Sequence, residues 1–158
     1  MTWATTDIPT SPGSYVVTLG LREGERVRVG ALGWGTLSAG YYLYAGSAFG
    51  SGGLRARLSR HLAGGRTLRW HVDYLRRECL PVMAWFQPQS TPLEHEWARL
   101  LGRGRTLTMA WPGFGTSDCH CPTHLFYCQQ SPSLQTFRRR LARAGLDTGG
   151  LSAIVAAK

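Results

Sequence analysis

Apolar and polar residues alternate along two early stretches of the chain, 13–21 and 26–32. Alternation at a period of two is typical of strands that bury one face, and the polar segment 22–25 (REGE) between them predicts a tight turn. We therefore expect these two strands to pair as a hairpin. Further strands are predicted over 40–45 (GYYLYA), 82–86 and 124–128.

Leucines spaced four residues apart mark the clearest helix. Leu54, Leu58 and Leu62 would share one face of a helix over 54–63, after a glycine-rich approach. An amphipathic pattern with outward arginines predicts a helix over 132–144. A short helix over 70–80 and a loop over 112–123 (PGFGTSDCHCPT) complete the expected elements.

The first residues of the segment 91–101 (TPLEHEWARLL) predict a further helix. Thr91 is a favourable N-cap and Pro92 suits the first helical position. Glu94 and Glu96 would complement the dipole at the start of this helix.

Strands and helices are interspersed along 158 residues, which predicts a single α+β domain with a core of its own. No composition shift or linker divides the chain. We divide it into a loose lead-in over 1–12, a main domain over 13–130, and a basic helix and tail over 131–158. The Gly- and Ala-rich end of the tail is expected to fray.

The chain is strongly basic, with 18 Lys and Arg against 9 Asp and Glu, a net charge of +9 and a pI of about 10.1. No carboxylate occurs between Glu25 and Asp73. A domain of this charge favours a polyanionic partner, and all its cations except Lys158 are arginines, which grip phosphate bidentately. The alternative is a solvated basic surface that reflects an arginine-rich proteome.

Several basic residues of the acid-free segment are candidates for contact with nucleic-acid phosphates. The expected helix over 54–63 presents some of them around its leucine stripe, and a merely solvated helix face is the alternative. The candidates are Arg55, Arg60, Arg66, Arg69 and His71.

Nothing in the chain predicts a membrane partner. The uncharged stretch 29–54 is rich in glycine and polar residues, and the first residues have neither a basic nor an apolar segment typical of a signal. Four cysteines without such a signal favour a reduced, cytoplasmic protein.

Three short motifs carry a resemblance to a known family. They are Gly13-Ser14-Tyr15, Tyr44-Ala45-Gly46 and Leu54-x-x-Arg57-Leu58-x-x-His61. Together they resemble the GIY-YIG nuclease superfamily. The segments GYYLYAGSA, LRARLSRHL, WHVDYL and GFGTSDCHCPTHLFY are similar to its Uri-type branch, so that the resemblance runs from about Gly13 to Cys128.

The resemblance implies a small three-stranded antiparallel sheet flanked by helices, here with an extra strand and loop region and a C-terminal Arg-rich helix. It implies hydrolysis of DNA phosphodiester bonds with one Mg²⁺ or Mn²⁺ ion, in DNA repair or processing. Relatives of this branch occur attached to an endonuclease III-like repair glycosylase, so such an enzyme is an expected partner beside DNA.

The same resemblance implies roles for the motif residues. Tyr15 takes the place of the general base or its relay, Tyr44 supports the site, and Arg57 stabilises charge on the phosphate. His61 lies one helical turn after Arg57 and could contact phosphate or shuttle a proton. A buried histidine satisfied by a carbonyl is the alternative for His61.

The metal carboxylate is expected on the helix over 91–101. Mg²⁺ keeps several waters, so one glutamate suffices. Glu94 precedes an apolar Trp-Ala pair at 97–98, as the family's metal ligand does, and we favour it over Glu96.

Cys119, Cys121 and His124 could be three ligands of a structural zinc ion, with His95 as a candidate fourth. Cys128 and Cys79 are other candidates for that fourth place. The alternative is a glycine-rich loop whose cysteines are simply packed.

The expected function is therefore that of a metal-dependent DNA endonuclease. The chain departs from the family pattern in two ways: it contains no asparagine, and the gap from Gly46 to Arg57 is long. Both departures favour a rival, a nucleic-acid-binding module of the same fold that does not cut. A zinc-stabilised interaction domain is a further alternative, and the choice between DNA and RNA stays open.

Overall fold

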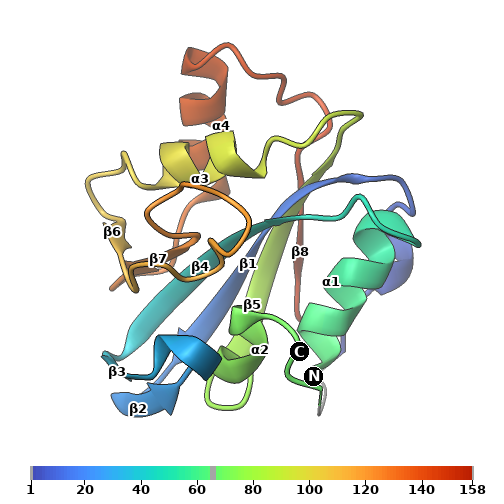
Figure 1. Ribbon diagram of the computed structural model, residues 1–158. Helices are drawn as coiled ribbons and strands as arrows, with labels where there is room; N and C mark the ends of the chain where they lie inside the picture. The colour runs from blue at the N-terminus through green and yellow to red at the C-terminus, as the bar shows by residue number, and fades with distance from the viewer. Residues whose placement is uncertain (1, 65–66, 158) are drawn as a thin grey trace.

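The protein is built on a six-stranded antiparallel sheet, with strand order β6-β7-β4-β1-β5-β8 (Figure 1). The computed structural model describes residues 2–64 and 67–157. The strands of this sheet are β1 Gly13–Leu21, β4 Gly40–Ser47, β5 Leu80–Pro88, β6 Thr108–Met109, β7 Leu125–Cys128 and β8 Ser152–Val155. A separate hairpin pairs β2 Glu25–Arg28 with β3 Trp34–Leu37.

Two pairs of α-helices cover the sheet, one pair on each face (Figure 1). The helices are α1 Gly53–Ala63, α2 His71–Leu75, α3 Glu94–Leu101 and α4 Leu134–Arg143, with short 3₁₀ turns at Thr5–Asp7 and Gly30–Leu32. None of these described helices is long and apolar enough to cross a membrane.

The expected three-stranded sheet is wrong. The described residues place β4, β1 and β5 at its centre, but β7 and β6 extend it on one side and β8 on the other. The strand expected over 124–128 is β7, whereas β6 and β8 have 2 and 4 residues, too few for their alternation to be read from sequence. All three outer strands nevertheless pair with a free edge: β7 with β4, β6 with β7, and β8 with β5.

The expected hairpin between 13–21 and 26–32 is also wrong, because β1 pairs with β4 and β5 instead. All but one residue of β1 are buried, which requires neighbours along both edges and cover on both faces. By contrast, β2 exposes Arg26 and Arg28 and suits a peripheral hairpin.

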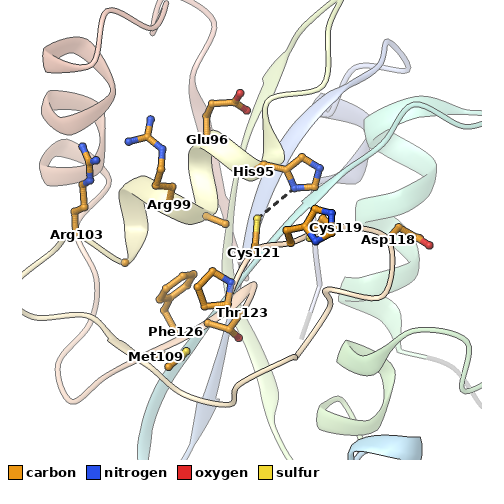
Figure 2. A pocket seen from close by; sticks show the side chains of 14 residues that line it. His95, Glu96, Arg99, Arg103, Met109, Asp118, Cys119, Cys121, Thr123 and Phe126 are labelled. Atoms are coloured by element: carbon orange, nitrogen blue, oxygen red, sulfur yellow. Dashed lines mark hydrogen bonds between the residues drawn. The ribbon is translucent and has the colours of Figure 1, made fainter.

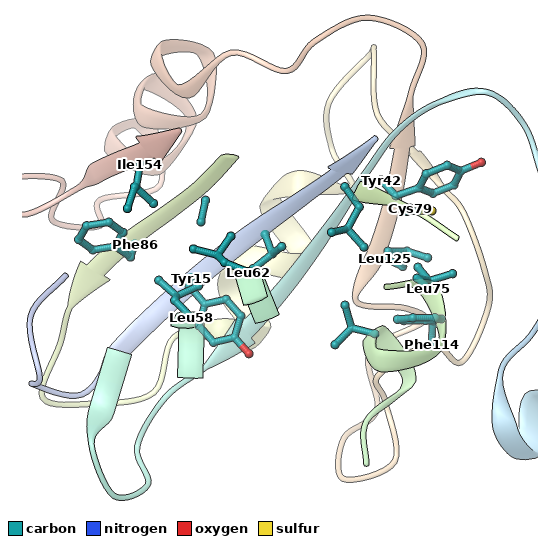
Figure 3. Close-up of a cluster of buried hydrophobic side chains, with 14 of the residues drawn as sticks. Tyr15, Tyr42, Leu58, Leu62, Leu75, Cys79, Phe86, Phe114, Leu125 and Ile154 are labelled. Carbon is teal, nitrogen blue, oxygen red and sulfur yellow. The ribbon is translucent and has the colours of Figure 1, made fainter. Parts of the chain in front are cut away.

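Alternate residues of β1 supply the two cores. Tyr15, Val17 and Leu19 face α1 and α2, where Leu58 and Leu62 pack against them (Figure 3). Val16 faces α3 and α4, in a cluster that contains Trp85, Trp97, Phe126, Phe137 and Leu141. The alternation read from the sequence therefore describes a central strand with one apolar face and one face of smaller, partly polar residues, both of them buried.

The C-terminal tail is part of the sheet and does not fray as expected. Residues 152–155 of β8 pair with residues 83–86 of β5, and Ile154 is buried. A bridge between Thr2 and Ala157 brings the two ends of the chain together (Figure 1).

The helix over 91–101 begins later than Thr91 and Pro92 predict. Its N-cap is Leu93, no side chain caps it, and Glu94 is the first helical residue. Because the first turn is uncapped, its stability depends on what its side chains contact.

Candidate functional site

The GSY and YAG motifs lie side by side on β1 and β4. In this register Tyr15 is opposite Gly46, and Val17 is opposite Tyr44. The pairing therefore brings the two tyrosines of the motifs to the same face of the sheet, the one covered by α1.

Tyr15 and His61 form a buried pair beneath α1. The Tyr15 Oη atom lies 2.8 Å from His61 Nε2, and the side chains are 1% exposed each. Burial raises the pKa of Tyr15 well above its ordinary value, against the opposing effect of the nearby Arg57 guanidinium. Burial lowers the pKa of His61 to about 3, so this imidazole is neutral at physiological pH.

The hydrogen bonding of His61 favours one tautomer. Among the described residues its Nδ1 atom has no hydrogen-bond partner. A buried N–H without an acceptor is rarer and more costly than a lone pair without a donor. The proton therefore belongs on Nε2, which donates to the Tyr15 oxygen.

Tyr44 packs at the edge of the cluster formed by Tyr15 and His61. Its ring meets His61 at a centroid distance of 6.2 Å and Phe114 at 5.9 Å, both edge to face. Burial raises the pKa of Tyr44 well above its ordinary value. Tyr44 therefore stays a neutral phenol that packs against His61.

Arg57 lies near this cluster and is held in place by two contacts. Its guanidinium lies over the Trp70 ring at 4.3 Å from the centroid, and Nη1 donates to the Ser47 carbonyl at 3.1 Å. Arg60 lies over the same ring at 4.0 Å. The tryptophan ring therefore contacts both guanidinium groups despite their like charge.

Asp73 neutralises one of these arginines. Its carboxylate accepts hydrogen bonds from Arg60 Nη1 and Nη2, at 3.0 and 2.8 Å. It also accepts hydrogen bonds from the backbone N–H groups of Arg69 and Trp70, both at 2.8 Å. Burial on its own raises the pKa of Asp73, but these hydrogen bonds together lower it below its ordinary value. Arg57 has no carboxylate of this kind among the described residues.

Glu94, the first residue of α3, reaches the end of β4. Ser47 Oγ donates to its Oε1 at 3.0 Å, and Oε2 lies 4.0 Å from His124 Nδ1. The side chain of Glu94 is 25% exposed and so is only partly buried. Ser47 thus joins the Arg57 guanidinium and the Glu94 carboxylate through its carbonyl and its hydroxyl.

Glu96 lies on another side of α3. With Arg99 and Arg103 it lines a mostly apolar cleft of about 840 Å³, whose floor includes Met109 and Phe126 (Figure 2). Of the two glutamates proposed from sequence, Glu94 is the one near the motif residues.

His95, Cys119, Cys121 and His124 form a compact cluster beside Glu94. Figure 2 shows three of the four, His95, Cys119 and Cys121. One ligand atom from each lies within 4.8 Å of the others. Cys119 Sγ is 3.2 Å from His124 Nε2, and Cys121 Sγ is 3.5 Å from His95 Nδ1. This Cys₂His₂ set could hold a metal ion such as zinc.

The basic residues proposed to bind nucleic acid have different surroundings. Arg55 donates to the carbonyls of Ile8 and Thr6, at 2.7 and 3.0 Å, and so anchors the lead-in to α1. His71 Nδ1 accepts the Gly115 N–H at 2.7 Å, while Arg69 is exposed over Trp70. Arg66 lies outside the described residues.

Sequence reasoning missed Ser47 and Trp70. Ser47 directly follows the YAG motif, so its place on β4 was the available signal. Trp70 begins the WHVDYL segment, and the arginine directly before it, Arg69, was the available sign of stacking.

The fold and the site define an α+β protein with a tyrosine, histidine, arginine and carboxylate cluster at one end of its central strands. The chain belongs to the family described as domain of unknown function DUF123, whose model matches residues 14–145. The matched region runs from β1 to just past α4 and does not include β8. Neither the curated proteins nor the solved structures contain a match to this chain.

Proposed function

We propose that this protein is a divalent-metal-dependent endonuclease of the GIY-YIG type, which hydrolyses DNA phosphodiester bonds in DNA repair or processing. One observation carries the proposal: Ser47 at the end of β4 contacts both Arg57 and Glu94, next to the buried Tyr15. These residues come from two strands and two helices, between Tyr15 and Glu94. Their convergence supports the roles implied by the motif resemblance.

Tyr15 would accept a proton from the attacking water or relay it. Its oxygen receives the hydrogen bond of His61 Nε2 and lies close to Arg57, and both interactions favour the phenolate. Burial opposes ionisation, so Tyr15 acts as a base only when further positive charge is present in the site. Neutral His61 keeps its proton and orients the phenol.

Arg57 would stabilise the transition state. The charge that develops on the non-bridging oxygens of the phosphate requires a fixed cation, and a preorganised guanidinium costs little reorganisation. Trp70 and the Ser47 carbonyl hold Arg57 in place while its remaining N–H groups stay available. Its lack of a carboxylate partner among the described residues leaves its charge free for a phosphate.

Glu94 fits the place of a ligand for Mg²⁺ or Mn²⁺. Its carboxylate is partly exposed, is oriented by Ser47, and offers the oxygen donors that hard cations prefer. When bound, such an ion lowers the pKa of a coordinated water and offsets phosphate charge. The neighbouring Cys₂His₂ cluster has softer donors and suits a separate, structural zinc ion.

Nicking of supercoiled plasmid and cleavage of branched DNA, each with Mg²⁺, Mn²⁺ or EDTA, test the proposal. We expect metal-dependent cleavage that Arg57→Ala reduces by at least 100-fold. Arg139→Ala is the matched control, because Arg139 is exposed on α4 and its loss changes the net charge equally. An unchanged rate in Arg57→Ala would refute the site.

The same assay distinguishes the endonuclease from its rival, a nucleic-acid-binding module that does not cut. A binding module of this fold would retard DNA on a gel equally well in EDTA and cleave none of the substrates. That outcome would replace the endonuclease proposal with the binding one.

A further inference from the structure

We propose that a zinc ion held by His95, Cys119, Cys121 and His124 fixes the position of Glu94, so that binding of the catalytic metal depends on the zinc. This inference rests on the proposed function, because it concerns the carboxylate assigned there to Mg²⁺ or Mn²⁺. It gives the Cys₂His₂ cluster a role in the site beyond holding the loop.

The first argument is the uncapped start of α3. Leu93 is the N-cap, and no side chain accepts a hydrogen bond from the first turn of the helix. A carboxylate on the first helical residue is held in place only as firmly as the first turn itself is held. The Ser47 hydroxyl holds the Glu94 carboxylate, but nothing in the helix itself fixes the first turn that carries it.

The second argument is that His95 can anchor this turn. Consecutive helical residues point about 100° apart. Here Glu94 reaches Ser47, while His95 reaches Cys121, as Figure 2 shows. His95 is exposed, so packing alone does not hold it. A bond from His95 to a zinc ion on the 119–124 loop would tie the first turn of α3 to that loop.

The third argument is the orientation of His124. This imidazole is 1% exposed; its Nε2 faces Cys119, and its Nδ1 lies 3.0 Å from the Ala45 carbonyl and 4.0 Å from Glu94 Oε2. A zinc ion on Nε2 would place the ring proton on Nδ1, which then donates to Ala45 and faces Glu94. Ala45 is the central residue of the YAG motif on β4.

The cluster therefore connects three parts of the site: the 119–124 loop, the first turn of α3, and β4. The pair of Tyr15 and His61 and the stack of Arg57 on Trp70 have no hydrogen bond to its residues among the described contacts. Loss of zinc should therefore weaken metal binding at Glu94 and leave the arginine stack in place.

Mn²⁺ binding tests the dependence of the Glu94 site on zinc without measuring cleavage. The electron paramagnetic resonance signal of free Mn²⁺ measures how much of the ion is bound. Zinc content is measured on the same samples by mass spectrometry. We expect one zinc per wild-type chain, and we expect Cys121→Ser to lose the zinc and bind Mn²⁺ at least tenfold more weakly. Among the described residues Cys121 has no hydrogen bond to Glu94 and bonds to His95 instead, so the expected effect passes through the cluster.

His120→Ala is the matched control, since His120 is exposed between the two cysteines and is not one of the four ligands. It should keep both zinc and Mn²⁺ binding. If Cys121→Ser does not fold, the exposed His95→Gln replaces it with the same expectation.

Zinc-free Cys121→Ser that binds Mn²⁺ as tightly as wild type overturns the inference, as does a wild-type chain without zinc. A different result is expected if the proposed function fails because Glu94 does not bind the catalytic metal. In that case Glu94→Gln keeps its zinc and binds Mn²⁺ no more weakly than wild type, and the coupling is overturned together with the Glu94 assignment.

Discussion

Tyr15 on β1 lies directly opposite Gly46 on β4, and its phenol fills the space where a side chain at position 46 would stand. A Cβ atom added to Gly46 would lie 2.5 Å from both Cζ and Oη of Tyr15. No real side chain tolerates so short a contact, so the ring would have to move. The glycine of the YAG motif is therefore required by the tyrosine of the GSY motif.

Gly46→Ala is accordingly expected to displace Tyr15 from His61. Overpacking of this kind costs about 1–3 kcal/mol, which urea unfolding would measure. Cleavage in the plasmid assay should fall by more than the loss of folded protein explains. Gly50→Ala is the control, because the nearest atom to its new Cβ is Arg57 Nη2 at 3.9 Å. Equal behaviour of the two variants would contradict the role of the contact.

His61 should make stability depend on acid pH. Its pKa falls from an ordinary 6.5 to about 3 because burial disfavours the imidazolium. Between these values the unfolded chain binds a proton that the folded chain does not, so stability is fully present above pH 6.5 and is lost as pH falls towards 3. At about 1.4 kcal/mol per pKa unit, the total loss is a few kcal/mol.

His61→Gln removes this titration and leaves a side chain that can still donate to Tyr15. The difference in unfolding free energy between the variant and wild type should therefore shrink as pH falls from 6.5 to 4, measured by urea unfolding. Asp73 also titrates in acid, but it is present in both proteins, so the difference isolates His61. A difference that is constant with pH would refute a buried neutral imidazole.

Trp70 should act as a positioning residue for Arg57. Its ring lies 4.3 Å from the Arg57 guanidinium carbon and restricts the side chain that would contact the phosphate. Trp70→Leu keeps an apolar side chain but removes the stacking surface, and small misplacements of a catalytic group lower rates strongly. We expect kcat to fall at least tenfold, with a smaller change in KM.

Trp34→Leu is the matched control for this variant. Trp34 is 61% exposed on the β2–β3 hairpin and carries a comparable stack, with Arg26 at 5.0 Å from its centroid. Because it lies outside the site, its loss should leave kcat unchanged. A similar fall in both variants would indicate a general effect of arginine–tryptophan stacks on folding.

The inner part of the fold could be predicted from local patterns. The strand over 13–21 and the helix over 54–63 carry strong periodicity, and the structure confirms both nearly to the residue. Strand pairing could not be read in this way, since it depends on which edges remain free after the core forms. Hence the pairing of β1 with β4 and the addition of β8 to β5 were missed.

The residues of the candidate site likewise divide into those that local motifs predict and those that depend on tertiary contacts. Tyr15, Tyr44, Arg57 and His61 were found from short motifs within two strands and one helix. The preference for Glu94 over Glu96 rested on flanking residues, because both flank the apolar stripe of the helix. Their difference arises from tertiary contacts: Ser47 meets Glu94, whereas Glu96 lines the cleft near Arg99. The place of His95 beside the cysteines likewise depends on how the 119–124 loop folds back onto α3.

The last strand gives a prediction about stability. Ile154 on β8 is 8% exposed and packs into the cluster that contains Phe86 and Tyr15, although it lies beyond the region matched by the family model (Figure 3). Ile154→Ala should lower the unfolding free energy by about 2–4 kcal/mol, through lost burial and the cavity left behind.

Val155→Ala provides the comparison for Ile154, because Val155 is the next residue on β8 and is 62% exposed on the other side of the strand. Its truncation should change stability by about 0.5 kcal/mol or less. Urea unfolding of both variants measures the contrast. If Ile154→Ala is as mild as Val155→Ala, β8 does not close the core, and the tail contributes little to the folded state.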